Sequence, residues 1–259
     1  QFTMATLEEL GLLKMDFLGL RTLTVLKDTE NMIRKTDKNF SLDNISYDKK
    51  TFDMISRGDT QGVFQFESAG MKAVLSQLKP ENIEALIAVI SLYRPGPMES
   101  IPRYIRNRHH ESEITYKHPL LKNILDVTYG CIVYQEQVMQ IFRTLAGYSL
   151  GRADIVRRAI SKKKANVMEK EHDIFINGLV DKDGNVEVDG CIRRGISKEV
   201  ASSIYKEIEN FASYAFNKSH AAAYALISYR TAFLKCNYPK EYMASLLTSV
   251  IDNTDKVSI

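Results

Sequence analysis

The sequence has no tryptophan, only three cysteines among 259 residues, and no apolar run long enough to cross a membrane. Cys131, Cys191 and Cys236 lie far apart, and no Cys or His spacing typical of a zinc site accompanies them. An odd and sparse cysteine count suits a reducing compartment, so we expect a cytoplasmic protein with no membrane partner. The chain opens with Gln1 and enters a structured pattern at once, so we expect a piece of a longer protein.

The chain also lacks a strong overall charge, since its net charge is only +3 at pH 7. That charge is unevenly spread, because residues 94–164 hold thirteen Lys and Arg against six Asp and Glu, a net of +7. The remainder therefore carries about −4. A local basic surface on a nearly neutral protein indicates an anionic partner that is contacted by one face.

Helical spacing of apolar residues dominates the sequence, with about ten predicted helices and no repeats, so we expect a mainly α fold. Short strands are predicted at 12–18, 63–66 and 130–134, and Asp183-Gly184 predicts the turn of one β-hairpin within 180–188. The stretch 58–71 is rich in glycine, but it has neither P-loop nor GxGxxG spacing, which favours a structural turn. The predicted helices span 6–10, 20–36, 80–92, 103–110, 135–147, 151–164, 165–178, 197–213, 217–237 and 241–251, and the mixed stretch 43–56 ends in another helix.

The most basic stretch is 151–164, which holds one acid, Asp154, against six cations. Read as a helix, it has a row of cations on one side and an apolar arc on the other, formed by Ile155, Val156, Ala159 and Ile160. Arg158 and Lys162 are neighbours one turn apart at the edge of that arc, and two such cations suit a polyphosphate. A solvated basic face is the alternative reading.

Other candidate contacts with an anion surround this helix. Arg94 lies in Tyr93–Met98, where two prolines and a glycine predict a rigid turn that fixes its direction. Arg103 and Arg106 share one helix face that suits phosphate contacts, although a solvated helix explains them equally well. Asn217 and His220 lie at the predicted start of a helix, where free N–H groups favour an anion; the alternative is a structural histidine.

One acid, Asp16, interrupts the apolar strand predicted at 12–18. A carboxylate in such surroundings needs a cation, hydrogen-bond donors or a metal as its partner. An exposed aspartate at the end of a strand is the alternative.

Six motifs, taken together and in order, resemble one family, the α subunit of bacterial DNA polymerase III, a C-family replicative polymerase. They cover nearly the whole chain, and six ordered motifs make a chance match improbable. The motifs are Lys14–Leu23 (KMDFLGLRTL), Gly58–Glu67 (GDTQGVFQFE), Tyr93–Met98 (YRPGPM), Arg157–Lys163 (RRAISKK), Phe216–His220 (FNKSH) and Tyr238-Pro239.

The resemblance implies that residues 1–20 close the palm domain and that residues 21–259 form the fingers, a mostly helical domain preceded by a palm-edge strand. Asp16 matches a catalytic carboxylate that helps to hold two Mg²⁺ ions for nucleotidyl transfer. The other two carboxylates of that triad belong to an upstream motif that this sequence does not contain. The resemblance also implies a sliding clamp and a clamp loader as partners of regions outside this sequence, at bacterial replication forks.

The resemblance assigns the cations as well. Arg94, Arg158 and Lys162 are expected to contact the triphosphate of an incoming dNTP, with Arg157 and Lys163 as second candidates. Asn217 and His220 are expected to shape the nucleotide pocket. Arg103, Arg106 and Lys164 are candidate contacts with phosphates of template-primer DNA.

Two other functions compete with this enzyme hypothesis. One is a helical nucleic-acid-binding module without catalysis, which predicts salt-sensitive DNA binding that is indifferent to dNTP. The other is a helical scaffold for a protein partner, which leaves the basic stretch without a role. One carboxylate cannot hold two metal ions, so we expect the chain alone not to polymerise DNA.

Overall fold

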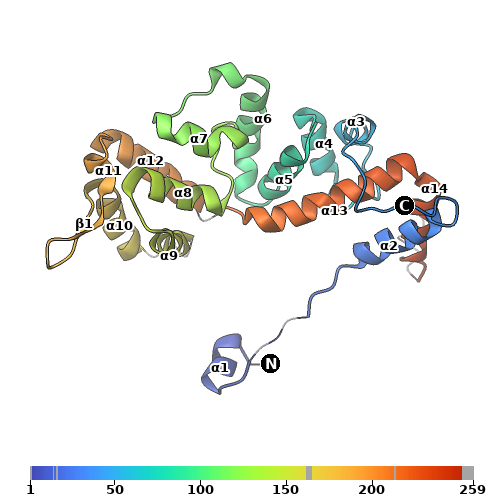
Figure 1. Cartoon of the computed structure of the whole chain (residues 1–259), viewed down its shortest axis with the longest axis horizontal. Helices are drawn as coiled ribbons and strands as arrows, with labels where there is room; N and C mark the ends of the chain where they lie inside the picture. The colour runs from blue at the N-terminus through green and yellow to red at the C-terminus, as the bar shows by residue number, and fades with distance from the viewer. Residues whose placement is uncertain (1, 14, 16, 162–164, 213, 253–259) are drawn as a thin grey trace. The chain divides into compact units, whose positions relative to one another are not determined.

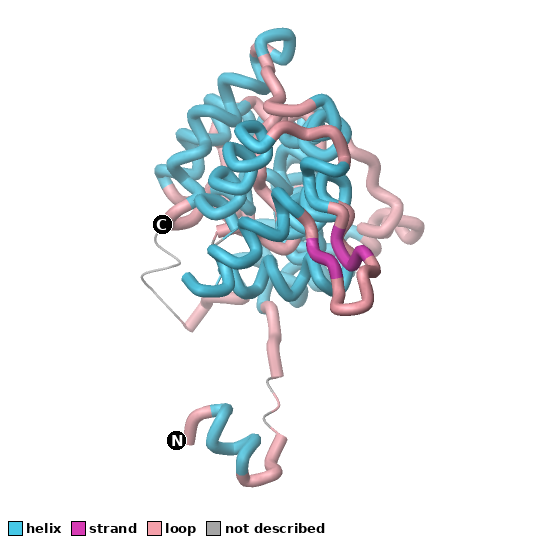
Figure 2. The backbone as a smooth tube through the Cα atoms, turned by 90° about the vertical axis from the view of Figure 1, so that its left-hand side faces the viewer, coloured by secondary structure: helices cyan, strands magenta, loops and turns pink. Residues whose placement is uncertain are grey.

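The computed structural model describes all residues except 1, 14, 16, 162–164, 213 and 253–259 (Figure 1). The described residues form fourteen α-helices and one two-stranded hairpin, which confirms the prediction of a mainly α fold (Figure 2). The elements are α1 Met4–Glu9, α2 Arg21–Ile33, α3 Lys49–Ser56, α4 Ala69–Leu78, α5 Ile83–Leu92, η1 Pro97–Ser100, α6 Ile101–His109, η2 Glu111–Glu113, η3 Pro119–Leu121, α7 Lys122–Leu125, η4 Asp126–Thr128, α8 Gln135–Ala146, α9 Leu150–Ser161, α10 Ala165–Asn177, β1 Leu179–Val180, β2 Val186–Val188, α11 Gly190–Arg193, α12 Lys198–Ala212, α13 Lys218–Asn237 and α14 Pro239–Thr248.

The chain divides into two compact units, residues 1–44 with 238–259, and residues 45–237. In the first unit α2 packs against α14, and Val25, Leu26 and Ile33 of α2 are buried. The carboxylate of Glu30 is buried too, where it meets Lys27, Arg34 and the Leu42 N–H. The predicted domain boundary after residue 20 stays a prediction.

The second unit has two hydrophobic cores, and α5 is the central element of the first. Every α5 residue from Ala85 to Leu92 is buried, because α13 and α4 pack against it. Figure 1 shows the long helix α13 running past α5 and α3. Asn82 caps α5, because its side-chain oxygen accepts a hydrogen bond from the Ala85 N–H at 3.0 Å.

The second core gathers around Phe142 of α8. Its ring packs edge-on against Phe175 of α10 and at tilted or edge-on angles against Tyr148 and Tyr205, with centroid distances of 5.1–6.1 Å. The basic helix α9 lies on this core, because α8, α10 and α12 all contact it. Val156 and Ile160 of α9 are buried, as the apolar arc predicted, and Ala159 is half-buried. Ala153, which was not assigned to that arc, is buried too. Ile155, which was predicted to belong to that arc, is 69% exposed.

The strand predictions were mostly wrong. The described residues of 12–18 form no strand, and Phe17 and Leu18 are at least 90% exposed. A strand forms only beside a partner strand, and none pairs with this segment in the described part of the chain. Residues 63–66 make a turn in which Val63 and Phe66 are buried. Residues 130–134 are irregular except for one parallel bridge between Tyr134 and Phe216.

The hairpin prediction is confirmed. Strands β1 and β2 are antiparallel, with Leu179 opposite Val188. The side chain of Asp181 accepts hydrogen bonds from the N–H groups of Asp183 and Asn185, which stabilises the turn. None of the helices in the described part of the chain is long and apolar enough to span a membrane.

Candidate nucleotide site

Arg94 is held in one direction, as the rigid turn predicted. Its Nε donates to the Ser91 carbonyl at 3.0 Å, and a terminal nitrogen donates to the Tyr214 carbonyl at 2.8 Å. The guanidinium carbon lies 4.1 Å from the centre of the Phe216 ring, a cation–π contact. Burial lowers the pKa of the Arg94 guanidinium, but an arginine stays cationic at neutral pH. No ion pair reaches Arg94 from the described residues, so its charge is not neutralised.

Two glycines allow the close packing that holds this turn. A Cβ at Gly70 of α4 would lie 2.2 Å from the hydroxyl oxygen of Tyr93, the residue before Arg94. A Cβ at Gly96 would lie 2.5 Å from the ring of Tyr214, and Gly96 has φ +100°, where side chains are strained. Tyr93 therefore packs against α4 on one side of Arg94, and Tyr214 packs against Gly96 on the other.

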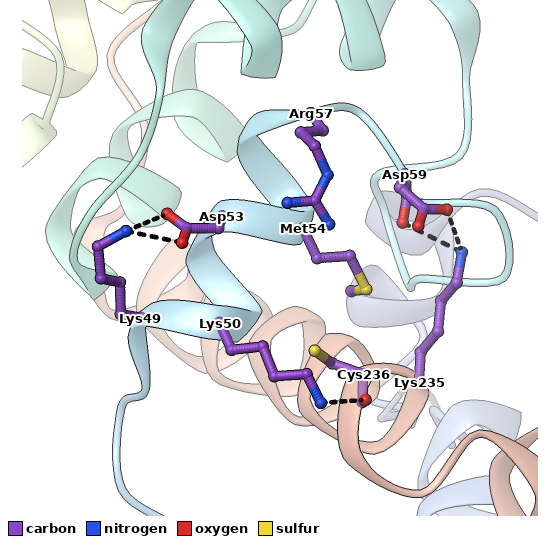
Figure 3. Close-up of a pocket in the computed structure, with 8 residues that line it drawn as sticks. All are labelled: Lys49, Lys50, Asp53, Met54, Arg57, Asp59, Lys235 and Cys236. Carbon is purple, nitrogen blue, oxygen red and sulfur yellow. Dashed lines mark hydrogen bonds and ion pairs between the residues drawn. The ribbon is translucent and has the colours of Figure 1, made fainter.

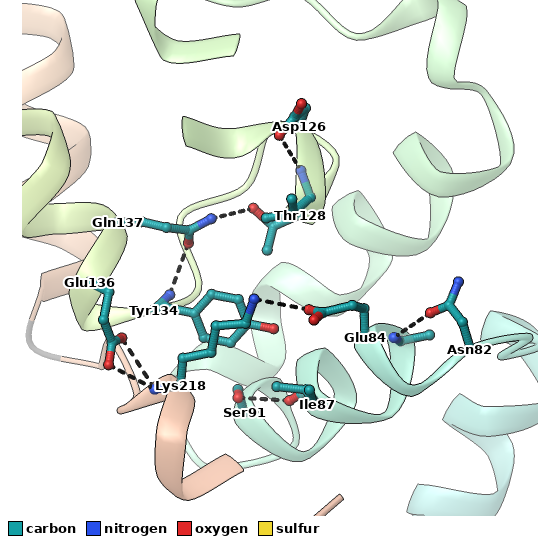
Figure 4. Close-up of polar contacts among 12 residues, drawn as sticks. Asn82, Glu84, Ile87, Ser91, Asp126, Thr128, Tyr134, Glu136, Gln137 and Lys218 are labelled. Carbon is teal, nitrogen blue, oxygen red and sulfur yellow. Dashed lines mark hydrogen bonds and ion pairs between the residues drawn. The ribbon is translucent and has the colours of Figure 1, made fainter. Parts of the chain in front are cut away.

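Phe216 is fixed by its backbone as well as by its ring. Its N–H donates to the Val133 carbonyl at 3.0 Å, and its carbonyl accepts from the Gln135 N–H at 2.9 Å. Those loop residues are themselves ordered by Gln137, whose side-chain oxygen accepts from the Val133 and Tyr134 N–H groups. Its amide nitrogen donates to Thr128 at 2.7 Å (Figure 4).

A row of rings continues from Phe216 along the first turns of α13. His220 lies edge-on to Phe216, with 5.3 Å between ring centroids, and 4.3 Å from Tyr224. Tyr224 in turn lies 5.4 Å from Phe64. The histidine is exposed while its neighbours are half-buried. The row of Arg94, Phe216, His220, Tyr224 and Phe64 therefore combines one uncompensated cation with ring faces, which suits a ligand that has both an anion and an aromatic base.

The start of α13 is less free for an anion than the sequence predicted. Asn217 caps the helix, because its side-chain oxygen accepts from the His220 N–H at 2.8 Å. The Lys218 N–H donates to both oxygens of Glu136 at 3.1 and 3.2 Å, and the Lys218 ammonium pairs with Glu84 at 3.0 Å (Figure 4). A carboxylate of the protein therefore occupies the position that an anionic ligand would take.

On α9 the carboxylate of Asp154 forms ion pairs with both Arg157 and Arg158. Arg157 donates twice to one oxygen of Asp154, and Arg158 meets the other oxygen at 2.8 Å. The Arg157 hydrogen bonds hold the pKa of the Asp154 carboxyl below its ordinary value, and Arg158 adds to this effect. The Arg157 side chain is only 12% exposed, whereas that of Arg158 is 68% exposed and keeps donors for a ligand. The predicted contacts Lys162, Lys163 and Lys164 lie outside the described residues.

Arg103 and Arg106 of α6 differ in their surroundings. Arg103 pairs with Glu207 of α12 at 3.1 Å and also donates to the Gly130 carbonyl, and Lys117 pairs with the same glutamate at 2.9 Å. Arg106 is exposed, and no hydrogen bond or ion pair joins its side chain to another described residue.

The structure brings Arg94, Asn217 and His220 together and places Arg157 and Arg158 on a different core. Sequence reasoning missed the rings of Phe64 and Tyr224 and the carboxylate of Glu136. Helical spacing places His220 and Tyr224 one turn apart, so that pair was detectable. The contacts of Phe64 and Glu136 join distant parts of the sequence and leave no local signal.

The predicted metal ligand, Asp16, lies outside the described residues. Within the part of the chain that the structure describes, no group of three or more His, Cys, Asp or Glu could hold a metal ion. The prediction that Asp16 helps to hold Mg²⁺ therefore stays a prediction.

Comparison with known proteins gives consistent matches. A family model for the bacterial DNA polymerase III alpha subunit finger domain matches residues 22–183. DNA polymerase III subunit alpha of Borreliella burgdorferi is 50% identical over 259 residues, which is 100% of this chain and 22% of that protein. The same subunit of Bacillus subtilis is 49% identical, with coverages of 100% and 22%, and that of Thermus aquaticus is 47% identical, with coverages of 100% and 21%. The chain thus spans about a fifth of the length of these relatives.

Proposed function

Because this chain belongs to the family of bacterial DNA polymerase III α subunits, in which it matches the finger domain, we propose that it is part of a replicative DNA-directed DNA polymerase and binds the incoming dNTP. The observation that carries the proposal is the uncompensated guanidinium of Arg94, fixed on the Phe216 ring and beside His220. Desolvated, oriented cations bind phosphate oxygens more strongly than mobile ones do, because little order is lost on binding.

The proposed ligand contacts differ in role. Arg94, Arg158 and Lys162 contact the triphosphate and compensate the charge that develops on the leaving pyrophosphate. Arg157 is a weaker candidate than Arg158, since both of its contacting nitrogens are engaged by Asp154. Lys163 is likewise a second candidate. Asn217 shapes the pocket by capping α13, and His220 offers its ring to the nucleotide.

The reaction of the whole polymerase would be attack of a primer 3′-hydroxyl on the α-phosphate of the dNTP. Asp16, with carboxylates outside this sequence, would hold two Mg²⁺ ions that stabilise the attacking and leaving oxygens. Arg103, Arg106 and Lys164 are proposed contacts with template-primer phosphates, and Arg106 is the freest described cation of this group. The sliding clamp and clamp loader would bind elsewhere on the parent protein, in the cytoplasm at replication forks.

The test uses the whole polymerase carrying Arg94→Ala or Arg158→Ala, in steady-state primer extension with varied dNTP. We expect the apparent KM for dNTP to rise about tenfold or more, because each substitution removes charge-assisted hydrogen bonds to phosphate. Arg94→Lys keeps the charge but loses the planar fork over Phe216, so part of the effect should remain.

Arg193→Ala is the matched control, since Arg193 is an exposed arginine of α11, remote in sequence from the proposed site. Its KM should equal that of the unmodified enzyme. If Arg94→Ala leaves both KM and kcat unchanged, the nucleotide site is not where we place it.

A further inference from the structure

An open cavity of about 590 Å³ lies between α3 and the last turn of α13 (Figure 3). Lys50, Met54 and Arg57 line it from α3 and its final turn, and Lys235 and Cys236 line it from α13. Residues 50, 54 and 57 follow helical spacing, so they share one face of α3 and place two cations about 10 Å apart along it.

The cavity carries a net positive charge. Its lining holds four cations and two carboxylates, a net of +2. The two carboxylates are already paired, because Asp53 meets Lys49 at 2.7 Å and Asp59 meets Lys235 at 3.0 Å. Within the described part of the chain, Lys50 donates only to neutral oxygens, the Cys236 carbonyl at 3.1 Å and the Asn237 side chain at 3.5 Å. The net charge therefore resides on Lys50 and Arg57.

Contacts within the fold explain why Lys50 and Lys235 line the cavity, but they do not explain the position of Arg57. Lys50 donates to the Cys236 carbonyl at the end of α13, where a cation stabilises the helix dipole. Lys235 donates to the Gln61 carbonyl and pairs with Asp59, so it fastens the loop after α3 to α13. Arg57 is exposed, and no hydrogen bond or ion pair joins its guanidinium to another described residue. Figure 3 shows its side chain extending over the cavity above Met54.

This cavity is separate from the proposed nucleotide site. Cys236 lies sixteen residues after His220 on the same helix, which is about 24 Å at 1.5 Å per residue. The ring row occupies the first turns of α13, and the cavity occupies its last turn. One ligand of nucleotide size cannot contact both.

We propose that this cavity is a second anion site, which binds a phosphate group through Arg57 and Lys50. The fork of Arg57 donates to two phosphate oxygens, and the Lys50 ammonium, seven residues away on the same face, supplies the second charge. The phosphate belongs either to a free nucleotide or to a nucleic-acid backbone, since both present the same oxygens. A phosphate can bind there without breaking the Lys49–Asp53 or the Lys235–Asp59 ion pair.

Cys236 provides a reporter inside the cavity. It is half-buried, whereas Cys131 and Cys191 are fully buried, and burial raises the pKa of those thiols to about 11 and about 12. The whole polymerase is alkylated with N-ethylmaleimide at constant ionic strength and pH 7, and modification of the Cys236 peptide is followed by mass spectrometry. Inorganic phosphate, dATP, single-stranded DNA and duplex DNA are added in separate experiments.

We expect alkylation of Cys236 to slow about tenfold when the bound phosphate compound is present at ten times its Kd. Arg57→Ala should weaken this protection about tenfold or more, and Lys50→Ala should weaken it as well. Lys198→Ala removes an equal charge from an exposed position on α12 and should leave protection unchanged. Protection by dATP and inorganic phosphate identifies a nucleotide site, whereas protection by DNA alone identifies a backbone site.

Two results would overturn the proposal. One is an alkylation rate of Cys236 that none of the four compounds changes. The other is protection that persists fully in the Arg57→Ala and Lys50→Ala enzymes. Because the readout is chemical access to Cys236, it does not depend on whether Arg94 binds dNTP.

Discussion

Arg94, Arg108 and Arg152 are all half-buried, but their guanidinium groups differ in whether a carboxylate neutralises them. Arg152 pairs with buried Glu171 at 2.8 Å, and Arg108 donates to the carbonyls of Leu78 and Lys79 and pairs with Glu81 at 3.7 Å. These two arginines join elements of the fold, so their loss would mainly affect stability. Arg94 has carbonyl and ring contacts but no carboxylate partner among the residues that the structure describes. A half-buried cation without a carboxylate partner retains its attraction for an anionic ligand, so Arg94 is the first residue of the proposed site.

The buried carboxylate of Glu30 leads to a pH prediction at the same scale. Burial alone raises the pKa of Glu30, but hydrogen bonds from Lys27 and the Leu42 N–H, with the charge of Arg34, bring it below its ordinary value. A lowered folded-state pKa means that the unfolded chain binds the proton first as the pH falls. The stabilisation is therefore complete above the ordinary pKa of about 4.3 and is lost below it.

We expect Glu30→Gln to lower the free energy of unfolding of the first unit by about 1–2 kcal/mol at pH 7. The difference from the unmodified chain should shrink as the pH falls below about 4. Urea denaturation across this pH range measures it, with exposed Glu169→Gln as the control. A difference that is the same at pH 7 and at low pH would show that Glu30 is not ionised in the folded state.

At the scale of elements, α4 positions the turn that follows α5. Tyr93 packs so closely against Gly70 that any side chain there must displace the tyrosine ring. The Tyr93 hydroxyl also lies 3.5 Å from Ser68, which caps α4. The direction of Arg94 thus depends on a helix that begins twenty-five residues earlier in the sequence.

Gly70→Ala in the whole polymerase should move Tyr93 and raise the KM for dNTP about threefold to tenfold, with little loss of stability. Stability is nearly conserved because alanine favours a helix by about 0.5–1 kcal/mol over glycine. Adding Tyr93→Phe removes the hydroxyl oxygen that clashes and should restore the KM. Gly151→Ala is the control, since a Cβ on that helical glycine meets nothing within 4 Å. A double variant with the KM of Gly70→Ala alone would argue against this positioning role.

At the scale of the whole chain, the two units each have their own packing, and the second has two cores. The proposed triphosphate contacts Arg94 and Arg158 belong to different cores of the second unit. The predicted metal ligand Asp16 lies outside the described residues, and the resemblance places the other two carboxylates of the triad outside this sequence. We therefore expect nucleotide contacts without a complete catalytic centre in this chain.

This expectation leads to a prediction for the isolated chain. Primer extension with Mg²⁺ and all four dNTPs should give no product with the 259-residue chain, because one carboxylate cannot hold two metal ions. The whole polymerase, assayed at equal concentration, is the positive control. Mg²⁺-dependent synthesis by the chain alone would contradict the prediction and would require a metal site within this sequence.

Local signals predicted much of the fold. The apolar spacing of α5 and α8 and the turn at Asp183-Gly184 depend on residues within a few positions of each other. The pairing of Asp154 with Arg157 and Arg158 is also local, at three and four residues, and was detectable in the sequence. Local signals could not decide whether residues 12–18 form a strand, since a strand depends on a partner strand that is remote in sequence.

The sequence by itself determined the mainly α fold, the basic middle of the chain and, through ordered motifs, the polymerase family. Only the tertiary structure decided which cations remain uncompensated. Arg94 meets Phe216 across 122 positions, Arg103 meets Glu207 across 104, and Glu136 reaches Lys218 across 82. Helical periodicity is a property of neighbours, whereas the charge that an arginine presents to a ligand depends on which distant acid or ring the fold brings to it.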